Sequence, residues 1–271
     1  MNEHDYDIVA GYYDYLFADR TIDLNFWTTL AKQSEGTVLE FSCGTGRITF
    51  DMASAGVSVD GMDISQAMLD ISNKRLKKLD TRVAKRIRFI HGDSTDFSIP
   101  GKKYSAIFSP WGFVPLSDAQ EDSCFNCVID HLQDNGIFVI DIDNMSETDV
   151  SWSRYRLKEY KKIPGKEFTL MREGFNSGDV KRRETTTLFR LSKISDNGNI
   201  KQYCYQIRYR TYTRQQLESV LLGFGFEIDS VYGDYNFSRW TSESPRTIIV
   251  ARYTKNMTLR KAYQRLCSWL K

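Results

Sequence analysis

From residue 37 to residue 143, short apolar runs alternate with longer stretches whose apolar positions recur at helical spacing. This alternation is typical of a parallel sheet whose strands are joined by crossover helices. The strand-like runs begin at Thr37, Val57, Arg86, Tyr104 and Ile137. We therefore predict an α/β fold with a Rossmann-like, doubly wound sheet.

The period changes to two beyond residue 145. Segments 166–175, 180–194 and 200–212 alternate between apolar and polar residues, and residues 195–199 read SDNGN, which suits a hairpin turn. These segments predict a small inserted antiparallel sheet.

The chain then returns to helical spacing at Thr213, with Gln216 at capping-box distance from it. Two further strands, FEIDSVYG and RTIIVARY, follow this helix and complete a seven-stranded sheet whose last pair is antiparallel. We divide the chain into an N-terminal helical cap (1–34), a core (35–145 and 213–254), the inserted sheet (146–212) and a basic amphipathic C-terminal helix (255–271).

Composition narrows the functional classes. The 271 residues carry a formal charge of only +2, and 41% are apolar, so the chain resembles an ordinary globular protein without a basic surface for nucleic acid. The N-terminus lacks the positive charge of a secretion signal, and no apolar run approaches the roughly 18 residues of a membrane span. Five scattered cysteines favour reduced thiols over a disulfide framework. We expect a cytoplasmic protein with a small-molecule partner.

The strongest motif is Val38-Leu-Glu-Phe-Ser-Cys-Gly-Thr-Gly-Arg47, which lies between a predicted strand and a predicted helix. Gly44 and Gly46 let the backbone approach a ligand, and the helix start offers free N–H groups. Asp63 ends the second strand, where a carboxylate can accept hydrogen bonds from ribose hydroxyls. Asp93 follows the third strand. A nucleotide-like ligand is therefore expected at this edge of the sheet.

These motifs together resemble the class I S-adenosylmethionine-dependent methyltransferases, in which an acidic residue precedes a Gly-x-Gly-x-Gly-like loop. Ser42 stands where the family has its first glycine. A dinucleotide fingerprint would need glycine or alanine at position 49, where this chain has threonine, so S-adenosylmethionine is favoured over NAD. The resemblance implies these cofactor-binding residues: Tyr12, Glu40, Ser42, Cys43, Gly44, Thr45, Gly46, Asp63, Ile64, Met68, Asp93, Ser94 and Ser109. No metal is expected.

The acceptor side is less clearly marked. Tyr12-Tyr13-Asp14 resembles the "YD" of small-molecule methyltransferases, in which a helix closes over the cofactor, and either tyrosine can fill that role. The Gly233-Asp234-Tyr235 loop resembles that of aminosugar and glycine-type N-methyltransferases. In the insertion, the face formed by Tyr203, Tyr205, Ile207 and Tyr209 opposes one with Arg208 and Arg210. The catalytic candidates are Tyr13, Trp111, Asp234 and Tyr235.

The expected function is methyl transfer to N or O of a small polar acceptor, plausibly a sugar or an amine. No histidine stands out as a general base; an amine needs chiefly to arrive neutral and aligned. Two alternatives remain. The basic tail 258–271 can recruit an O-methyltransferase of surface glycans to a membrane or to a protein partner. Ser42 and the missing base are also compatible with a non-catalytic nucleotide-binding module.

Overall fold

A computed structural model describes residues 6–17, 19–112, 117–145, 152–179 and 182–254 of the chain, with side chains described everywhere in these ranges except 152–159. The predicted C-terminal amphipathic helix, 255–271, lies outside the described residues. No helix in the described part is long and apolar enough to cross a membrane.

Seven strands form the core sheet, in the order β10-β11-β5-β4-β1-β2-β3. Strands β1 to β5 are parallel, while β11 runs antiparallel to both β5 and β10. The predicted Rossmann-like sheet with its antiparallel last pair is confirmed. The strands are β1 (Thr37–Phe41), β2 (Ser58–Asp63), β3 (Ile87–His91), β4 (Tyr104–Ser109), β5 (Leu132–Asp143), β10 (Phe226–Tyr232) and β11 (Arg246–Tyr253).

The chain winds in both directions from β1, which pairs with β2 on one side and with β4 on the other. This reversal is the switch point at which open α/β sheets bind ligands, beyond the carboxyl ends of the strands. The sheet positions the loops after β1, β2, β4 and β5 around that point.

Helices cover both faces of the sheet. Val38 packs in one buried cluster with Trp27 and Val139, whereas its neighbour Leu39 packs in another with Phe125. Successive side chains of a strand point to opposite faces, so β1 is buried on both sides. The helices are α3 (Leu24–Gln33), α4 (Arg47–Ser54), α5 (Gln66–Leu76), α6 (Thr81–Ala84), α7 (Asp118–His131) and α8 (Arg214–Gly223).

The start of β5 differs from the prediction. The predicted strand begins at Ile137, after the turn-like sequence Asp134-Asn-Gly136, but β5 begins at Leu132, which pairs with Tyr104. The register shifts after Tyr104, and Asn135 adopts a φ of 61°. The turn-forming residues are thus accommodated as an irregularity within the strand.

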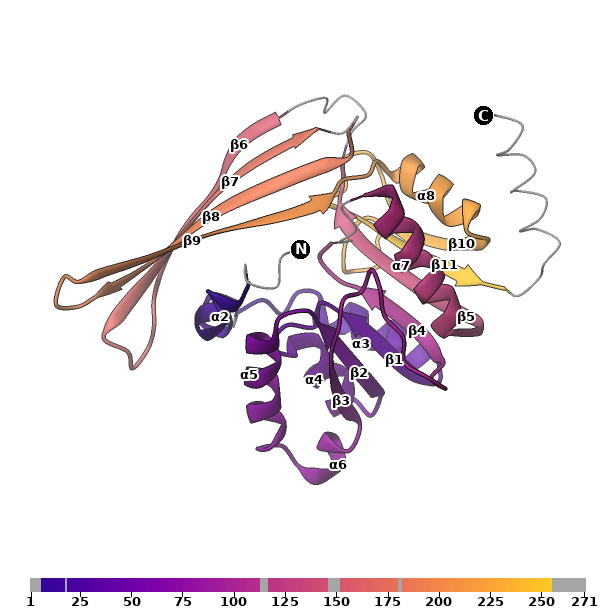
Figure 1. The fold of residues 1–271 in the computed structure, drawn as a ribbon, viewed down its shortest axis with the longest axis horizontal. Coiled ribbons are helices and arrows are strands. Elements are labelled where there is room, and N and C mark those ends of the chain that lie inside the picture. The colour runs from indigo at the N-terminus through magenta and orange to yellow at the C-terminus, as the bar shows by residue number, and fades with distance from the viewer. Residues whose placement is uncertain (1–5, 18, 113–116, 146–151, 180–181, 255–271) are drawn as a thin grey trace.

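The insertion forms a separate antiparallel sheet, which extends away from the core as a twisted arm (Figure 1). It has four strands rather than the three that we predicted: β6 (Trp152–Lys162), β7 (Phe168–Asp179), β8 (Glu184–Ser195) and β9 (Ile200–Arg210). Strand β6 was missed because a register shift between Tyr155 and Leu157 breaks the period of two. The predicted turn at 195–199 is confirmed by the bond from Ser195 N to Asn199 O, 2.8 Å.

Helix α2 (Ala10–Phe17) lies between the arm and the core sheet (Figure 1). Val9, just before the helix, is buried in a cluster with Leu170 of β7, Leu191 of β8 and Tyr205 of β9. The N-terminal segment therefore joins the inserted sheet to the cofactor side of the core.

The predicted cap of α8 is confirmed. The Thr213 hydroxyl accepts from the Gln216 backbone N–H at 3.2 Å, and the Gln216 side chain accepts from the Thr213 N–H at 2.9 Å. Both hydrogen bonds satisfy backbone donors that the first helical turn leaves unpaired.

We expect Thr213→Ala to lower the free energy of unfolding by about 1 kcal/mol, because it removes the side-chain acceptor of this cap. Thr213→Ser is the matched control, since it keeps the hydroxyl. Urea unfolding followed by circular dichroism measures both. Equal stability of the alanine and serine variants would show that the cap contributes nothing.

Candidate functional site

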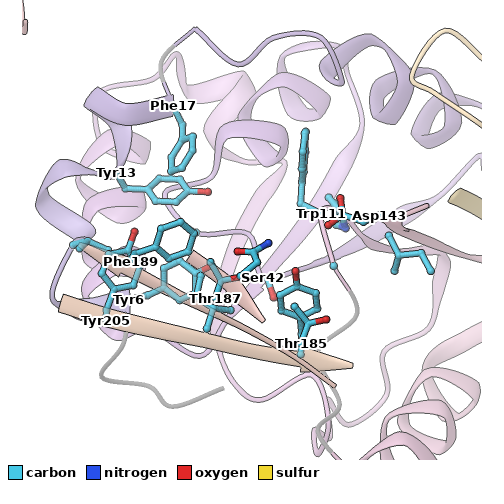
Figure 2. A pocket seen from close by; sticks show the side chains of 18 of the residues that line it. Tyr6, Tyr13, Phe17, Ser42, Trp111, Asp143, Thr185, Thr187, Phe189 and Tyr205 are labelled. Atoms are coloured by element: carbon cyan, nitrogen blue, oxygen red, sulfur yellow. The ribbon is translucent and has the colours of Figure 1, made fainter. Parts of the chain in front are cut away.

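A cavity of about 540 Å³ lies between the carboxyl edge of the core sheet, helix α2 and the inner face of the inserted sheet. Ser42 and Gly44 from the loop after β1, Asp63 after β2 and Trp111 after β4 line its core side. Figure 2 shows Tyr13 and Phe17 on one side of this space, with Trp111 on another and the strands that carry Thr187 and Phe189 opposite. A volume of this size is typical of small-molecule sites.

Asp63 organises the cofactor side of the cavity. Its Oδ2 accepts from Gly44 N at 2.7 Å, and its Oδ1 accepts from Ser65 N at 2.8 Å. Burial raises the pKa of Asp63, although these two hydrogen bonds oppose the rise. Each carboxylate oxygen accepts more than one hydrogen bond, so the group keeps capacity for ribose hydroxyls. A small adjoining pocket joins Asp63 to Asp93 and Ser94.

The loop after β1 has Ser42 where the resembled family has its first glycine, but its backbone keeps the conformation that a glycine would take. Ser42 adopts a φ of 52°, in the left-handed region that favours glycine, and Gly44 and Gly46 have φ of 56° and 84°. At Gly46 a β-carbon would stand 2.8 Å from the Phe50 ring, so that position has no room for a larger residue. Serine thus takes the backbone conformation expected of the missing glycine.

Three other predicted cofactor residues surround the loop without lining the main cavity. Glu40 is buried beneath it and accepts from the Thr49 hydroxyl at 2.5 Å. Burial raises the pKa of Glu40 to about 8, with Thr49 opposing the rise. Cys43 is buried, and the Thr45 hydroxyl donates to Asp14 of α2 at 2.6 Å. Ile64 and Met68, by contrast, line the cavity.

The structure distinguishes the two tyrosines of the "YD" motif. Tyr13 lines the cavity, and burial raises the pKa of its hydroxyl. Tyr12 does not line it: its hydroxyl lies 3.1 Å from that of Tyr203, and its ring meets Phe168 edge-on. Of the two, Tyr13 is placed to face a cofactor, while Tyr12 packs α2 against the inserted sheet.

The indole of Trp111 is hydrogen-bonded to Asp23, which belongs to the N-terminal cap (1–34). Its indole N–H donates to Asp23 Oδ2 at 2.6 Å, and the same carboxylate accepts from both terminal nitrogens of Arg47, at 2.6 and 2.7 Å. Burial alone would raise the pKa of Asp23, but these hydrogen bonds hold it below its usual value. One carboxylate therefore joins the cap, the start of α4 and the loop after β4.

Asp141 holds the same tryptophan from its backbone. This fully buried carboxylate accepts from Trp111 N at 3.1 Å, from the Tyr235 hydroxyl at 2.8 Å and from Arg246 Nε at 2.8 Å. Two guanidinium groups also lie over the Trp111 ring: Arg20 at 4.0 Å and Arg246 at 4.8 Å from a ring centroid. Trp111 is thus fixed in a left-handed conformation, with a φ of 61°.

The remaining acceptor-side candidates from the Gly233 loop do not line the cavity. Tyr235 is buried behind Trp111, at 5.5 Å between ring centroids, and its hydroxyl is engaged by Asp141. Asp234 accepts from the backbone N–H groups of Asn236 and Ser238, which closes its own turn. Ser109 likewise donates to Gly112 O at 2.7 Å. These side chains support the wall of the site and do not face its interior.

The inserted sheet supplies the opposite wall. Of the residues predicted to share one face of β9, Tyr205, Ile207 and Tyr209 line the cavity, and Arg208 is exposed. Arg210, at the end of the strand, also lines the cavity, and it forms ion pairs with Asp118 and Glu121 of α7. Residues that the sequence did not single out complete this wall: Arg172, Asn176, Thr185, Thr187 and Phe189.

Arg20 was also missed. Its guanidinium lies between the Phe17 and Trp111 rings, at 4.6 and 4.0 Å from their centroids, and it reaches both the main cavity and a second one of about 460 Å³ behind α2. Burial lowers its pKa. In the described part of the chain no carboxylate forms an ion pair with it.

A family model described as "Methyltransferase domain" matches residues 38–136. Residues 38–136 of the chain therefore resemble a methyltransferase domain. This span begins with β1, contains the glycine loop, Asp63 and Asp93, and ends in β5. The sequence motifs and this match together indicate S-adenosylmethionine as the cofactor, and Asp63 at the switch point keeps acceptor capacity for ribose hydroxyls.

The curated relatives that this chain resembles are also named as methyltransferases. The putative methyltransferase YqeM of Bacillus subtilis is 21% identical, over 93% of this chain and 98% of its own length. An uncharacterized methyltransferase of Oceanobacillus iheyensis is 28% identical over 53% of this chain, and the match spans only 58% of that relative. Several other curated relatives are matched over about half of their length or less.

Solved methyltransferases share the fold beyond the core domain. The CcbJ methyltransferase from Streptomyces caelestis has a TM-score of 0.72 at 20% identity, covering 94% of this chain and 100% of its own. CalS10 from Micromonospora echinaspora, an amino pentose methyltransferase solved with S-adenosylmethionine bound, has a TM-score of 0.65 at 18% identity, covering 89% and 96%.

We expect Asp63→Ala to weaken S-adenosylmethionine binding roughly tenfold to a hundredfold, because charged hydrogen bonds to the ribose are lost. Asp60→Asn is the matched control: Asp60 is a buried carboxylate on the same strand, but it accepts from Tyr104 and Arg88 outside the cavity. Titration calorimetry measures both affinities. Unchanged binding by the Asp63 variant would contradict the assigned position of the ribose.

Glu40 should make the stability of the fold depend on pH. Its pKa is about 8 in the folded chain, against an ordinary value of 4.5, so between these values the folded state keeps a proton that the unfolded state releases. The stability that the folded state gains by keeping this proton is therefore lost as the pH rises from 4.5 to 8. Glu40→Gln removes it and should be more stabilising, relative to the native protein, at pH 8 than at pH 5. Denaturant unfolding of both proteins at pH 5 and at pH 8 measures this. An equal difference in unfolding free energy between variant and native protein at the two pH values would refute the prediction.

Proposed function

We propose that this protein transfers a methyl group from S-adenosylmethionine to the nitrogen of a small, polar, sugar-like amine. The observation that carries the proposal is the shared cavity. Gly44 and Asp63 of the loops after β1 and β2 line the same space as the inner face of the inserted sheet, which is part aromatic and part polar. A cofactor and a small acceptor can therefore meet there, enclosed by protein.

The cofactor fits along the carboxyl edge of the core sheet. The ribose would lie on Asp63, with the adenine toward Asp93 and Ser94 in the adjoining pocket. The methionine end would extend past Gly44 toward Arg20, whose guanidinium is suited to a carboxylate. In this orientation Tyr13, which lines the same cavity, would face the sulfonium, and its ring would shield it and interact with its charge.

The charges around the acceptor favour a neutral amine. Arg172 lies in the cavity wall, and the sulfonium adds a second positive charge when the cofactor is bound. Nearby positive charges lower the pKa of an ammonium group and so favour the form with a free lone pair. The nitrogen then attacks the methyl carbon in line with the leaving sulfur. A C–N bond forms, the C–S bond breaks, and the new ammonium later releases its proton to water.

A hydroxyl acceptor needs a base at the moment of transfer. No histidine is among the described residues of the cavity wall, and the carboxylate of Asp143 is paired with Arg246. Nitrogen is therefore the better acceptor atom. The amino pentose methyltransferase CalS10 has the same overall fold, which supports a sugar-like amine as the acceptor of this protein as well.

We expect transfer from trideuteromethyl-labelled S-adenosylmethionine to glucosamine or glucosamine 6-phosphate, detected by mass spectrometry, and none to glucose, which offers the same ring without an amine. The rate should rise with pH as the acceptor amine loses its proton. A reaction without the protein serves as the blank. Transfer to glucose but not to the amines would overturn the preference for nitrogen, and transfer to none of them would reject a sugar-like acceptor.

A further inference from the structure

Asn176 is a buried polar residue in the cavity wall with an unsatisfied acceptor atom. It lies on β7, its side chain is 1% exposed, and its Oδ1 has no hydrogen-bond partner among the described residues. Buried amide oxygens are almost always paired in folded proteins. An unpaired one in the wall of a ligand cavity indicates that the ligand supplies the missing donor.

The position of Asn176 within the sheet supports this interpretation. Side chains at 172, 174 and 176 of β7 share one face, and the first and last of them line the cavity. Gly174 lies between them and has no side chain, so nothing from this strand separates the guanidinium of Arg172 from the amide of Asn176. Across the β7–β8 ladder, Asn176 is paired with Thr187, which also lines the cavity.

The two ends of this wall differ in chemistry. Near Arg172 it is aromatic: the guanidinium lies 4.7 Å from the Phe17 ring centroid and 5.1 Å from that of Phe189. Near Asn176 it is polar, with Thr187 and Thr185 on the neighbouring strand. A ligand that presents an apolar ring face at one end and hydroxyl groups at the other matches this division.

We propose that Asn176 determines acceptor specificity by accepting a hydrogen bond from a hydroxyl group of a polyhydroxylated amine. This rests on the function proposed above, because it concerns the same cavity. The amide selects for hydroxyl groups near the amine that is methylated. An amine of similar ring size without hydroxyls leaves Oδ1 unpaired and is bound less tightly.

The test compares glucosamine with cyclohexylamine, a six-membered ring that carries a primary amine and no hydroxyl groups. Methyl transfer to each is measured for the native protein, for Asn176→Leu, which removes the acceptor oxygen at similar size, and for Asn176→Asp, which keeps an oxygen in that place. The affinity for S-adenosylmethionine is measured by calorimetry in parallel for all three.

We expect Asn176→Leu to raise the KM for glucosamine about tenfold, with little change in kcat or in cofactor affinity. Its preference for glucosamine over cyclohexylamine should fall by the same factor. Asn176→Asp should retain most of that preference, since only the acceptor oxygen is needed.

Three results would count against the inference. An unchanged KM for glucosamine in Asn176→Leu overturns the specificity role while leaving the proposed methyl transfer intact. Equal losses in the leucine and aspartate variants show that the oxygen is not what matters. Transfer to neither amine by the native protein, with normal cofactor affinity, rejects the sugar-like acceptor and this inference with it.

Discussion

The site depends on the buried carboxylate of Asp23. It accepts hydrogen bonds from both terminal nitrogens of Arg47 and from the indole of Trp111, and so joins three segments that are far apart in the sequence. A buried charge of this kind is stable only when its partners surround it, and removing one partner leaves the others unpaired. The cap, the helix that follows the cofactor loop and the loop after β4 must therefore be in place together.

Asp141 completes this arrangement from the other side. Because Trp111 is bonded at its indole to Asp23 and at its backbone to Asp141, its ring has little freedom. The hydrogen bond from Tyr235 and the ion pair with Arg246 tie the tryptophan to the last two strands of the sheet. The antiparallel strand pair thus has a role in the site although neither strand carries the glycine loop. Much of the cavity wall is held by residues that themselves face away from the cavity.

The sequence was informative where local patterns determine the structure. The seven core strands, the hairpin turn at 195–199 and the cap at Thr213 each have a local signal, and each was predicted. Strand β6 was not, because its register shift removes the alternation by which a strand is recognised. In the site, Asp63 and Gly44 could be found because both lie next to strand ends.

Other site residues could not be found in this way. Arg20, Arg172 and Asn176 have no motif, and what matters about them is the neighbour that each meets across the fold. The tyrosines of β9 could be assigned to one face of that strand, but only the pairing of β7 with β8 reveals that Asn176 and Thr187 share the same face. Tyr12 and Tyr13 illustrate the same limit, because adjacent residues of one helix face different partners.

The two walls of the cavity come from separate parts of the chain. The cofactor wall is built from loops of the core sheet, whereas Arg172, Asn176 and Thr187 belong to strands that pair only with one another. Under the proposed function, substitutions on the inner face of the arm would change which acceptor is methylated without altering how the methyl donor is bound. Such a division would let acceptor choice change through a few alternate positions on β7 to β9 while the loops of the core sheet stay the same.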